Sequence, residues 1–261
     1  MNPADAALVA GAGLLAGAVN AVAGGGTLIS FPALLAAGLP AVSANTTSSV
    51  GLLAGYVGGS VGYRRELAGQ GARIRALAVV SVLGGVLGAV LLLVTPADAF
   101  RSLVPYLVLL SCALLAAQPK LSAFVQRRRE RTAPVPDAGA PRHDISPLVV
   151  AGVGIASIYG SYFGAGLGVL LLAVLGVLLQ DGLQRLNALK GLLSLIVNLV
   201  GVLIFAVTGT VDWAFAGILA VSALAGGYFG VGIARKVPAN VLRAAVVVFG
   251  TVVAVSLIVR G

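Results

Sequence analysis

One apolar stretch of this sequence carries a line of polar side chains that includes a lysine. Its residues stand at i, i+3, i+7 and i+11, the spacing of one helix face: Asn187, Lys190, Ser194 and Asn198. An ammonium group in an apolar stretch is costly unless it reaches water or finds a partner. No acidic residue lies in the core of any apolar segment. Lys190 is therefore predicted to attract an anionic ligand; the alternative is that it extends to the aqueous surface near Arg185.

A second polar face occurs in the first half of the chain. Its residues are Asn45, Ser48, Ser49, Leu52 and Tyr56, with Thr46 and Thr47 beside them. A polar face on an otherwise apolar helix turns toward protein or a water-filled cavity. The two faces are therefore predicted to line a binding site. Hydrogen bonding between helices, without a ligand, is the alternative role.

Each polar face is preceded by a glycine-rich break in the apolar pattern. Residues 20–27 read Asn-Ala-Val-Ala-Gly-Gly-Gly-Thr, and residues 159–166 read Tyr-Gly-Ser-Tyr-Phe-Gly-Ala-Gly. Glycine lets the backbone approach a ligand closely, and a helix that begins at such a break offers unpaired N–H groups and the positive end of its dipole. Helix starts near Gly26 and Gly166 are thus predicted to form an anion site. Tight crossing of helices is the alternative role for these glycines.

The elements that must position these residues are apolar helices. The chain has 261 residues, 59% of them hydrophobic and 10% charged, with a mean hydropathy of +1.06. A soluble domain has about 25% charged residues, and no alternating barrel pattern is present, so the sequence predicts an all-α integral membrane protein. The apolar segments are 6–22, 28–39, 42–61, 76–94, 103–117, 148–158, 167–179, 186–207, 213–233 and 244–259. The second and seventh are too short to cross a bilayer, which takes ~20 residues.

The order of these features repeats in the two halves of the chain. With a two-residue insertion in the second half, the matching pairs include Gly24 and Gly164, Gly26 and Gly166, and Asn45 and Asn187. The predicted architecture is therefore about ten transmembrane or half-membrane helices in two five-helix repeats, with paired broken or short helices. The repeats cover residues 1–118 and 147–261, and a basic, proline-rich linker covers 119–146.

Basic residues fall in alternate loops of this architecture. Lysine or arginine follows the third, fifth, seventh and ninth segments, whereas the loops after even-numbered segments contain only Arg101. The positive-inside rule places the odd-numbered loops and the linker in the cytoplasm and both termini outside. With five segments per half, the second repeat is then inverted. Because these loops account for the net charge of +9, a nucleic-acid partner is not expected.

Residue types that hold cofactors are scarce. Cys112 lies in an apolar run and is expected to pack as a small hydrophobe. His143 lies in the polar linker, and no Cys/His cluster predicts a metal site. No cofactor is expected. The first residues lack the basic start of a signal peptide, so the first apolar segment is expected to be retained.

The motifs around the first break resemble those of the TauE/SafE family, also called TSUP. From Gly17 onward they comprise the cluster at 23–27, Phe-Pro-Ala-Leu-Leu at 31–35, Gly-Leu-Pro at 38–40 and Ala-Asn-Thr-Thr-Ser at 44–48. The pattern recurs more loosely over 164–198, where Leu171-Leu172 stands at the place of Phe31-Pro32. The resemblance covers nearly the entire chain. It implies a permease of the bacterial inner membrane for sulfite, sulfonates or related small anions.

These observations predict a secondary transporter that exports small organosulfur anions. An inside-negative potential favours outward movement of an anion by about 2.3 kcal/mol per charge for ~100 mV, so no acidic relay is required. The substrate is predicted to bind at the midplane between the two breaks. The predicted substrate contacts are Gly24, Gly25, Gly26, Thr27, Asn45, Thr46, Ser48, Tyr56, Tyr162, Gly164, Gly166, Asn187, Lys190, Ser194 and Asn198.

Other functions remain open at this point. An uptake carrier or an anion channel would share the architecture. An intramembrane enzyme could use Ser194 and Lys190, which stand four apart on one helix, although no nucleophile motif surrounds Ser194. A structural or assembly protein would not explain the polar faces. Lipid and a small anion are the expected partners. The sequence determines neither the oligomeric state nor the coupling ion, and it allows a homodimer.

Overall fold

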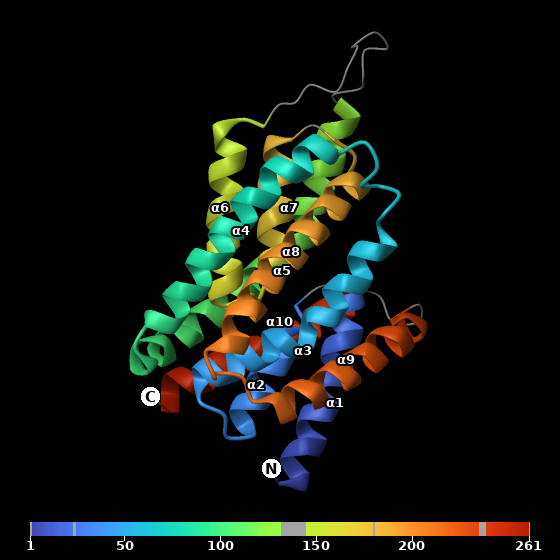
Figure 1. Ribbon diagram of the computed structural model, residues 1–261. Helices are drawn as coiled ribbons and strands as arrows, with labels where there is room; N and C mark the ends of the chain where they lie inside the picture. Colours follow the sequence, from blue (N-terminus) through green and yellow to red (C-terminus); the bar gives the residue numbers. More distant parts are fainter. Residues whose placement is uncertain (1, 23–24, 132–144, 180, 235–238, 261) are drawn as a thin grey trace.

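A computed structural model describes residues 2–22, 25–131, 145–179, 181–234 and 239–260. Over these ranges the chain is entirely helical, with ten helices and no strand (Figure 1). The helices are α1 (Pro3–Val22), α2 (Thr27–Ala36), α3 (Ala41–Gly62), α4 (Gly71–Val94), α5 (Ala97–Arg131), α6 (Pro147–Tyr162), α7 (Leu167–Leu178), α8 (Leu183–Val207), α9 (Trp213–Ala234) and α10 (Ala239–Arg260).

Five of the helices are long and apolar enough to cross a membrane. These spans are Pro3–Asn20, Gly71–Val94, Ala97–Arg127, Leu183–Val207 and Asn240–Val259. Many large apolar side chains on the outside of the structure are exposed, among them Leu83, Leu203 and Val259. Such a surface suits lipid rather than water. The chain is an all-α, multi-pass membrane protein.

Helix α5 extends further than the sequence indicated. The apolar pattern predicted a segment ending at 117 and a linker from 119, but α5 continues through Pro119 to Arg131. Proline removes one backbone donor, which a long helix tolerates when neighbouring turns remain bonded. The residues that follow include lysine, leucine, alanine, glutamine and arginine, all good helix formers. The remainder of the predicted linker, 132–144, lies outside the described residues.

Both glycine-rich breaks separate a longer helix from a short one, as the sequence predicted. α2 has 10 residues and begins after Gly26, whereas α7 has 12 residues and begins after Gly166. α2 leads to the start of α3, where Thr46 Oγ1 donates to the Thr210 carbonyl at 3.1 Å. α7 leads to the opposite end, where Arg185 in the first turn of α8 contacts the loop after α3. The two short helices therefore run from the breaks toward opposite ends of the structure.

The helices pack in pairs that correspond between the halves. α1 packs along α9 and α6 packs along α4, while α3 contacts α8 and α5 contacts α10. Glycines permit the closest approaches, because a Cβ added at Gly17 or Gly226 would collide with backbone of the facing helix in the α1–α9 pair. Gly88 plays the same part between α4 and α6. Small residues at crossing points are typical of membrane helices. If each of the helices α1–α5 is exchanged with the helix five places further along, the same set of pairs results.

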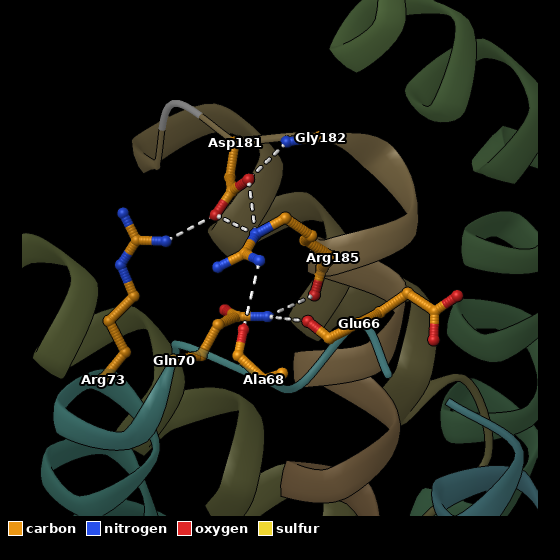
Figure 2. A network of polar contacts seen from close by, with 7 residues as sticks. All are labelled: Glu66, Ala68, Gln70, Arg73, Asp181, Gly182 and Arg185. Carbon is orange, nitrogen blue, oxygen red and sulfur yellow. Dashed lines mark hydrogen bonds and ion pairs between the residues drawn. The ribbon is translucent and has the colours of Figure 1, made fainter. Parts of the chain in front are cut away.

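One end of the structure is held together by a polar network around Asp181 (Figure 2). The Asp181 carboxylate accepts hydrogen bonds from Arg73 Nη1 at 2.6 Å, from Arg185 Nε and from the Gly182 N–H at 2.7 Å. Burial alone would raise the pKa of this carboxyl, but the three donors outweigh burial and lower its pKa. Asp181 is therefore ionised at neutral pH and joins the start of α4 to the start of α8.

The loop between α3 and α4 is fastened at the same end. Gln70 Nε2 donates to the Glu66 carbonyl at 2.9 Å and to the Arg185 carbonyl at 3.2 Å, and Arg185 Nη1 donates to the Ala68 carbonyl (Figure 2). The loop after α8 lies at the other end of α3, where the Asp212 N–H donates to Thr47 Oγ1. The start of α1 and the end of α10 also lie toward that lower end in Figure 1. The α3–α4 loop and the start of α8 thus lie at the opposite end of the structure from the start of α1 and the end of α10.

Candidate functional site

A cavity of about 680 Å³ lies between the two glycine-rich breaks. Residues of α1, α2, α3, α5, α7, α8 and α9 line it, so both halves of the chain contribute. Eight of the predicted contacts are among its lining residues: Gly25, Thr27, Tyr56, Gly164, Gly166, Asn187, Lys190 and Ser194. The cavity extends to Tyr63 and Tyr228, whose side chains are exposed. Tyr63 directly follows α3, at the start of the loop that contacts the beginning of α8.

Glycine is required by backbone geometry at both breaks. Gly25, Gly164 and Gly166 have positive φ angles of 99°, 82° and 82°, a region that costs other residues roughly 1–2 kcal/mol. The N–H groups of Leu167 and Val169 bond back to the Gly164 and Gly166 carbonyls. The N–H of Gly168, which lines the cavity, makes no such bond among the described residues. The start of α7 thus leaves an unpaired donor on a residue that lines the cavity.

The second break is braced by hydroxyl groups from α5 and α6. Tyr159 OH donates to the Ala165 carbonyl at 2.7 Å, and Ser111 Oγ lies 2.9 Å from the same oxygen. The two hydroxyls are 2.8 Å apart. Because Ala165 stands between Gly164 and Gly166, these bonds fix the backbone that precedes α7. The start of α7 is therefore preorganised beside the cavity.

The polar face of α8 turns into the cavity. Asn187, Lys190 and Ser194 all line it. Lys190 has neither a hydrogen-bond nor an ion-pair partner in the part of the chain that the structure describes. Ser194 Oγ is buried and likewise unpartnered there, so it makes no hydrogen bond with Lys190. The serine–lysine pair that an intramembrane enzyme would use is not assembled in this structure.

The polar face of α3 turns largely into protein. Asn45 Nδ2 donates to the Tyr162 carbonyl at 2.9 Å, and Ser48 Oγ lies 2.6 Å from Ser30 Oγ. Thr46 bonds to the Ser43 and Thr210 carbonyls. These residues are almost completely buried, and none of them lines the cavity. Hydrogen bonding between segments, the alternative role for a polar face, describes this part of α3.

Three further predicted contacts, Gly26, Tyr162 and Asn198, do not line the cavity. Gly26 precedes α2, and its carbonyl accepts a bond from Ser30 Oγ at 3.3 Å. Tyr162 packs edge-to-face on Phe100, with ring centres 5.6 Å apart. Asn198 Nδ2 donates to the Ser194 carbonyl at 2.8 Å. Gly24 lies outside the described residues.

Sequence reasoning missed a third polar face, on α5. Ser111, Leu115, Gln118 and Ser122 stand at i, i+4, i+7 and i+11, and all four line the cavity. The signal was the same helical spacing that identified α8. It was overlooked because the predicted segment ended at 117. Three further polar residues on the cavity wall, Asn20, Ser60 and Tyr63, were also missed, and Ser60 Oγ is buried without a partner among the described residues.

The chain is similar over nearly its whole length to proteins described as probable membrane transporters. It is 25% identical over 245 residues to the "Probable membrane transporter protein YfcA" of Escherichia coli strain K12, covering 94% of this chain and 86% of that protein. It is 23% identical over 249 residues to the "Probable membrane transporter protein ORF9" of Sinorhizobium sp, covering 95% and 90%. A "Probable membrane transporter protein" of Haemophilus influenzae is 24% identical over 236 residues, covering 90% and 88%.

The match to a described family is equally extensive. The family "Sulfite exporter TauE/SafE" matches residues 9–257. No solved structure matches the chain. The all-helical fold, the apolar spans and this match agree with the resemblance noted from the motifs around the first break. The chain is a membrane transporter and belongs to the TauE/SafE family.

Proposed function

We propose that this chain exports small organosulfur anions, such as sulfite or sulfonates, across the bacterial inner membrane. The observation that carries the proposal is Lys190, an ammonium group that lines the central cavity and lacks an anionic partner among the described residues. A charged group inside a membrane protein marks a substrate path unless it is paired. A small anion would supply the missing partner.

The donors around the cavity favour an oxyanion. Lys190, Asn187 and Ser194 can each donate a hydrogen bond, as can the Gly168 N–H at the start of α7. A sulfite or sulfonate head presents three oxygens that accept such bonds. The volume of about 680 Å³ exceeds what a bare inorganic anion needs and suits a small organic ligand. The cavity supports sulfonates as well as sulfite.

The arrangement of charges supports outward transport of anions. The basic loops near Arg73 and Arg185 would lie in the cytoplasm by the positive-inside rule. Tyr63, an exposed residue at the start of the α3–α4 loop, lines the cavity, so an opening beside it would admit a cytoplasmic anion. The membrane potential then favours its release outside by about 2.3 kcal/mol per charge for ~100 mV.

The proposal includes a duplicated and inverted architecture. The correspondence of the pairs α1–α9 and α6–α4, and the opposite courses of α2 and α7, support it. Single cysteines placed at Gly69 and Gly209 in a Cys112→Ala background test the orientation. We expect Gly69→Cys to react from the cytoplasmic side and Gly209→Cys from outside. Labelling of both from the same side would rule out the inversion.

Flux of radiolabelled sulfite into proteoliposomes tests the transport itself. We expect saturable uptake that an inside-positive voltage accelerates, and that excess unlabelled sulfonate inhibits. Flux that rises linearly with concentration and shows no exchange would identify an anion channel. Flux that requires an imposed proton or sodium gradient would identify an uptake carrier. Absence of anion flux in correctly inserted protein would contradict the proposed function.

A further inference from the structure

The polar face of α5 holds a glutamine whose orientation is fixed from outside the cavity. Gln118 lines the cavity, and its Oε1 accepts a hydrogen bond from Arg243 Nε of α10 at 3.3 Å. A guanidinium has only donors, so the amide oxygen of Gln118 must be the atom that faces Arg243. The amide NH₂ is then the group left for the cavity. It has no hydrogen-bond partner among the described residues.

Arg243 is itself held in place. Its Nη1 donates to Asn240 Oδ1 at 2.9 Å, one turn earlier on α10. The two bonds use separate nitrogens of one planar group, so they restrict the guanidinium on two sides. Arg243 does not line the cavity. It therefore acts on a ligand through Gln118 rather than by contact.

We propose that Gln118 is a specificity-determining hydrogen-bond donor for the transported anion, and that Arg243 is its positioning residue. This inference rests on the proposed function. Gln118 presents N–H groups and no acceptor to the cavity, which suits oxyanions and disfavours cations. Ser122 lies one turn further along the same face of α5 and also lines the cavity. Gln118 and Ser122 thus belong to the wall that α5 forms, whereas Lys190 belongs to the wall that α8 forms.

Two variants of Gln118 separate a substrate contact from a purely structural link between α5 and α10. Gln118→Glu keeps an acceptor for Arg243 and adds a charge that strengthens this link. It also removes the donor and places a carboxylate beside the anion. We expect the KM for sulfite in proteoliposomes to rise by more than about tenfold, whereas a purely structural Gln118 would leave KM unchanged.

Gln118→Met retains the length of the side chain without its amide. We expect a rise in KM of about tenfold, the loss of one hydrogen bond to a charged group, with little change in maximal rate. Gln126→Glu is the matched control, because Gln126 is an exposed residue of α5 that does not line the cavity. Its KM should equal that of the wild type.

Variants of Arg243 test the positioning role. Arg243→Met frees the amide to rotate and should raise KM, whereas Arg243→Lys retains a donor for Gln118 Oε1 and should restore a KM near that of the wild type. Gln118→Glu and Gln118→Met proteins that insert normally and keep the wild-type KM would overturn the inference while leaving the proposed function intact. Absence of sulfite flux in the wild type would instead contradict the proposed function.

Discussion

Extending the predicted alignment of Asn45 with Asn187 pairs Ser48 of α3 with Lys190 of α8, yet the surroundings of these two side chains differ. Ser48 is fully buried and bonded to Ser30 at 2.6 Å. Lys190 lines the cavity without a partner among the described residues. The same contrast holds for Asn45, which is bonded to the Tyr162 carbonyl, and Asn187, which faces the cavity. The first turns of the α3 face bond to protein, whereas Asn187, Lys190 and Ser194 of the α8 face line the cavity.

The difference teaches that polar spacing on a membrane helix identifies a face but not its partner. α3 begins beside the 208–212 loop, which uses Thr46 and Thr47 as hydrogen-bond partners. α8 begins near the Asp181 network and then follows the cavity. In the proposed repeat, one half would therefore hold structural hydrogen bonds and the other the groups that we propose to bind the anion. Lys190 gives the polar face of α8 a positive charge that the polar face of α3 lacks.

The largest effect is expected from filling the second break. Gly166→Val would place an L side chain at a φ of 82° and set its Cβ 3.2 Å from Leu114 Cδ1, beside the cavity. We expect sulfite flux to fall below detection in protein that still inserts in the membrane. Gly69→Val is the matched control, with a φ of 77° but open space around it. Equal flux in the two variants would show that the second break has no part in transport.

Serine variants on the two polar faces are expected to have an intermediate effect, and they compare the roles of the two faces directly. Ser194→Ala removes a hydroxyl that has no protein partner in the described residues, so it should raise the KM for sulfite about tenfold without lowering the melting temperature. Ser48→Ala removes a buried bond to Ser30 and should cost about 0.5–1.5 kcal/mol of stability with KM unchanged. The reverse pattern would exchange the roles assigned to α3 and α8.

The smallest effect on transport is expected at Asp181, which joins α4 to α8 outside the cavity. Its folded-state pKa lies below the unfolded value of about 3.9, so its stabilisation is present above that pH and is lost as pH falls through the folded pKa. Asp181→Asn should lower the melting temperature at pH 7 and leave the KM for sulfite unchanged. The difference from the wild type should shrink in acid below about pH 4.

Asp98→Asn provides the control for this change. Asp98 is exposed in the first turn of α5 and has no ion-pair partner among the described residues. Asp98→Asn should lower the melting temperature less than Asp181→Asn does. A melting-temperature loss at Asp181 that is independent of pH would contradict the electrostatic explanation.

Much of the fold could be predicted from the sequence because the membrane restricts it so strongly. Apolar length identified the spans, and the glycines of both breaks located the starts of α2 and α7 at Thr27 and Leu167. The extent of α5 could not be predicted, because Pro119 and the basic residues after it also suit a linker. Hydropathy measures compatibility with lipid and does not measure helix propensity beyond the bilayer.

The candidate site could be predicted only in part. Helical spacing found the cavity-facing residues of α8, but it gave the same signal for Asn45 and Ser48, whose partners come from distant segments. It missed Gln118, because the α5 face continued past the predicted end of the segment. Which polar side chains find protein partners depends on tertiary packing, and a single helix pattern does not contain that information.

The sulfite affinity of Lys190 variants tests the central claim most directly. Lys190→Gln keeps a polar side chain but removes the charge, whereas Lys190→Arg keeps the charge in a planar group. In correctly inserted protein, we expect Lys190→Gln to raise the KM for sulfite by more than about tenfold. We expect Lys190→Arg to retain partial function with altered selectivity among sulfonates. A wild-type KM in the Gln variant would contradict the claim that an unpaired Lys190 attracts the transported anion.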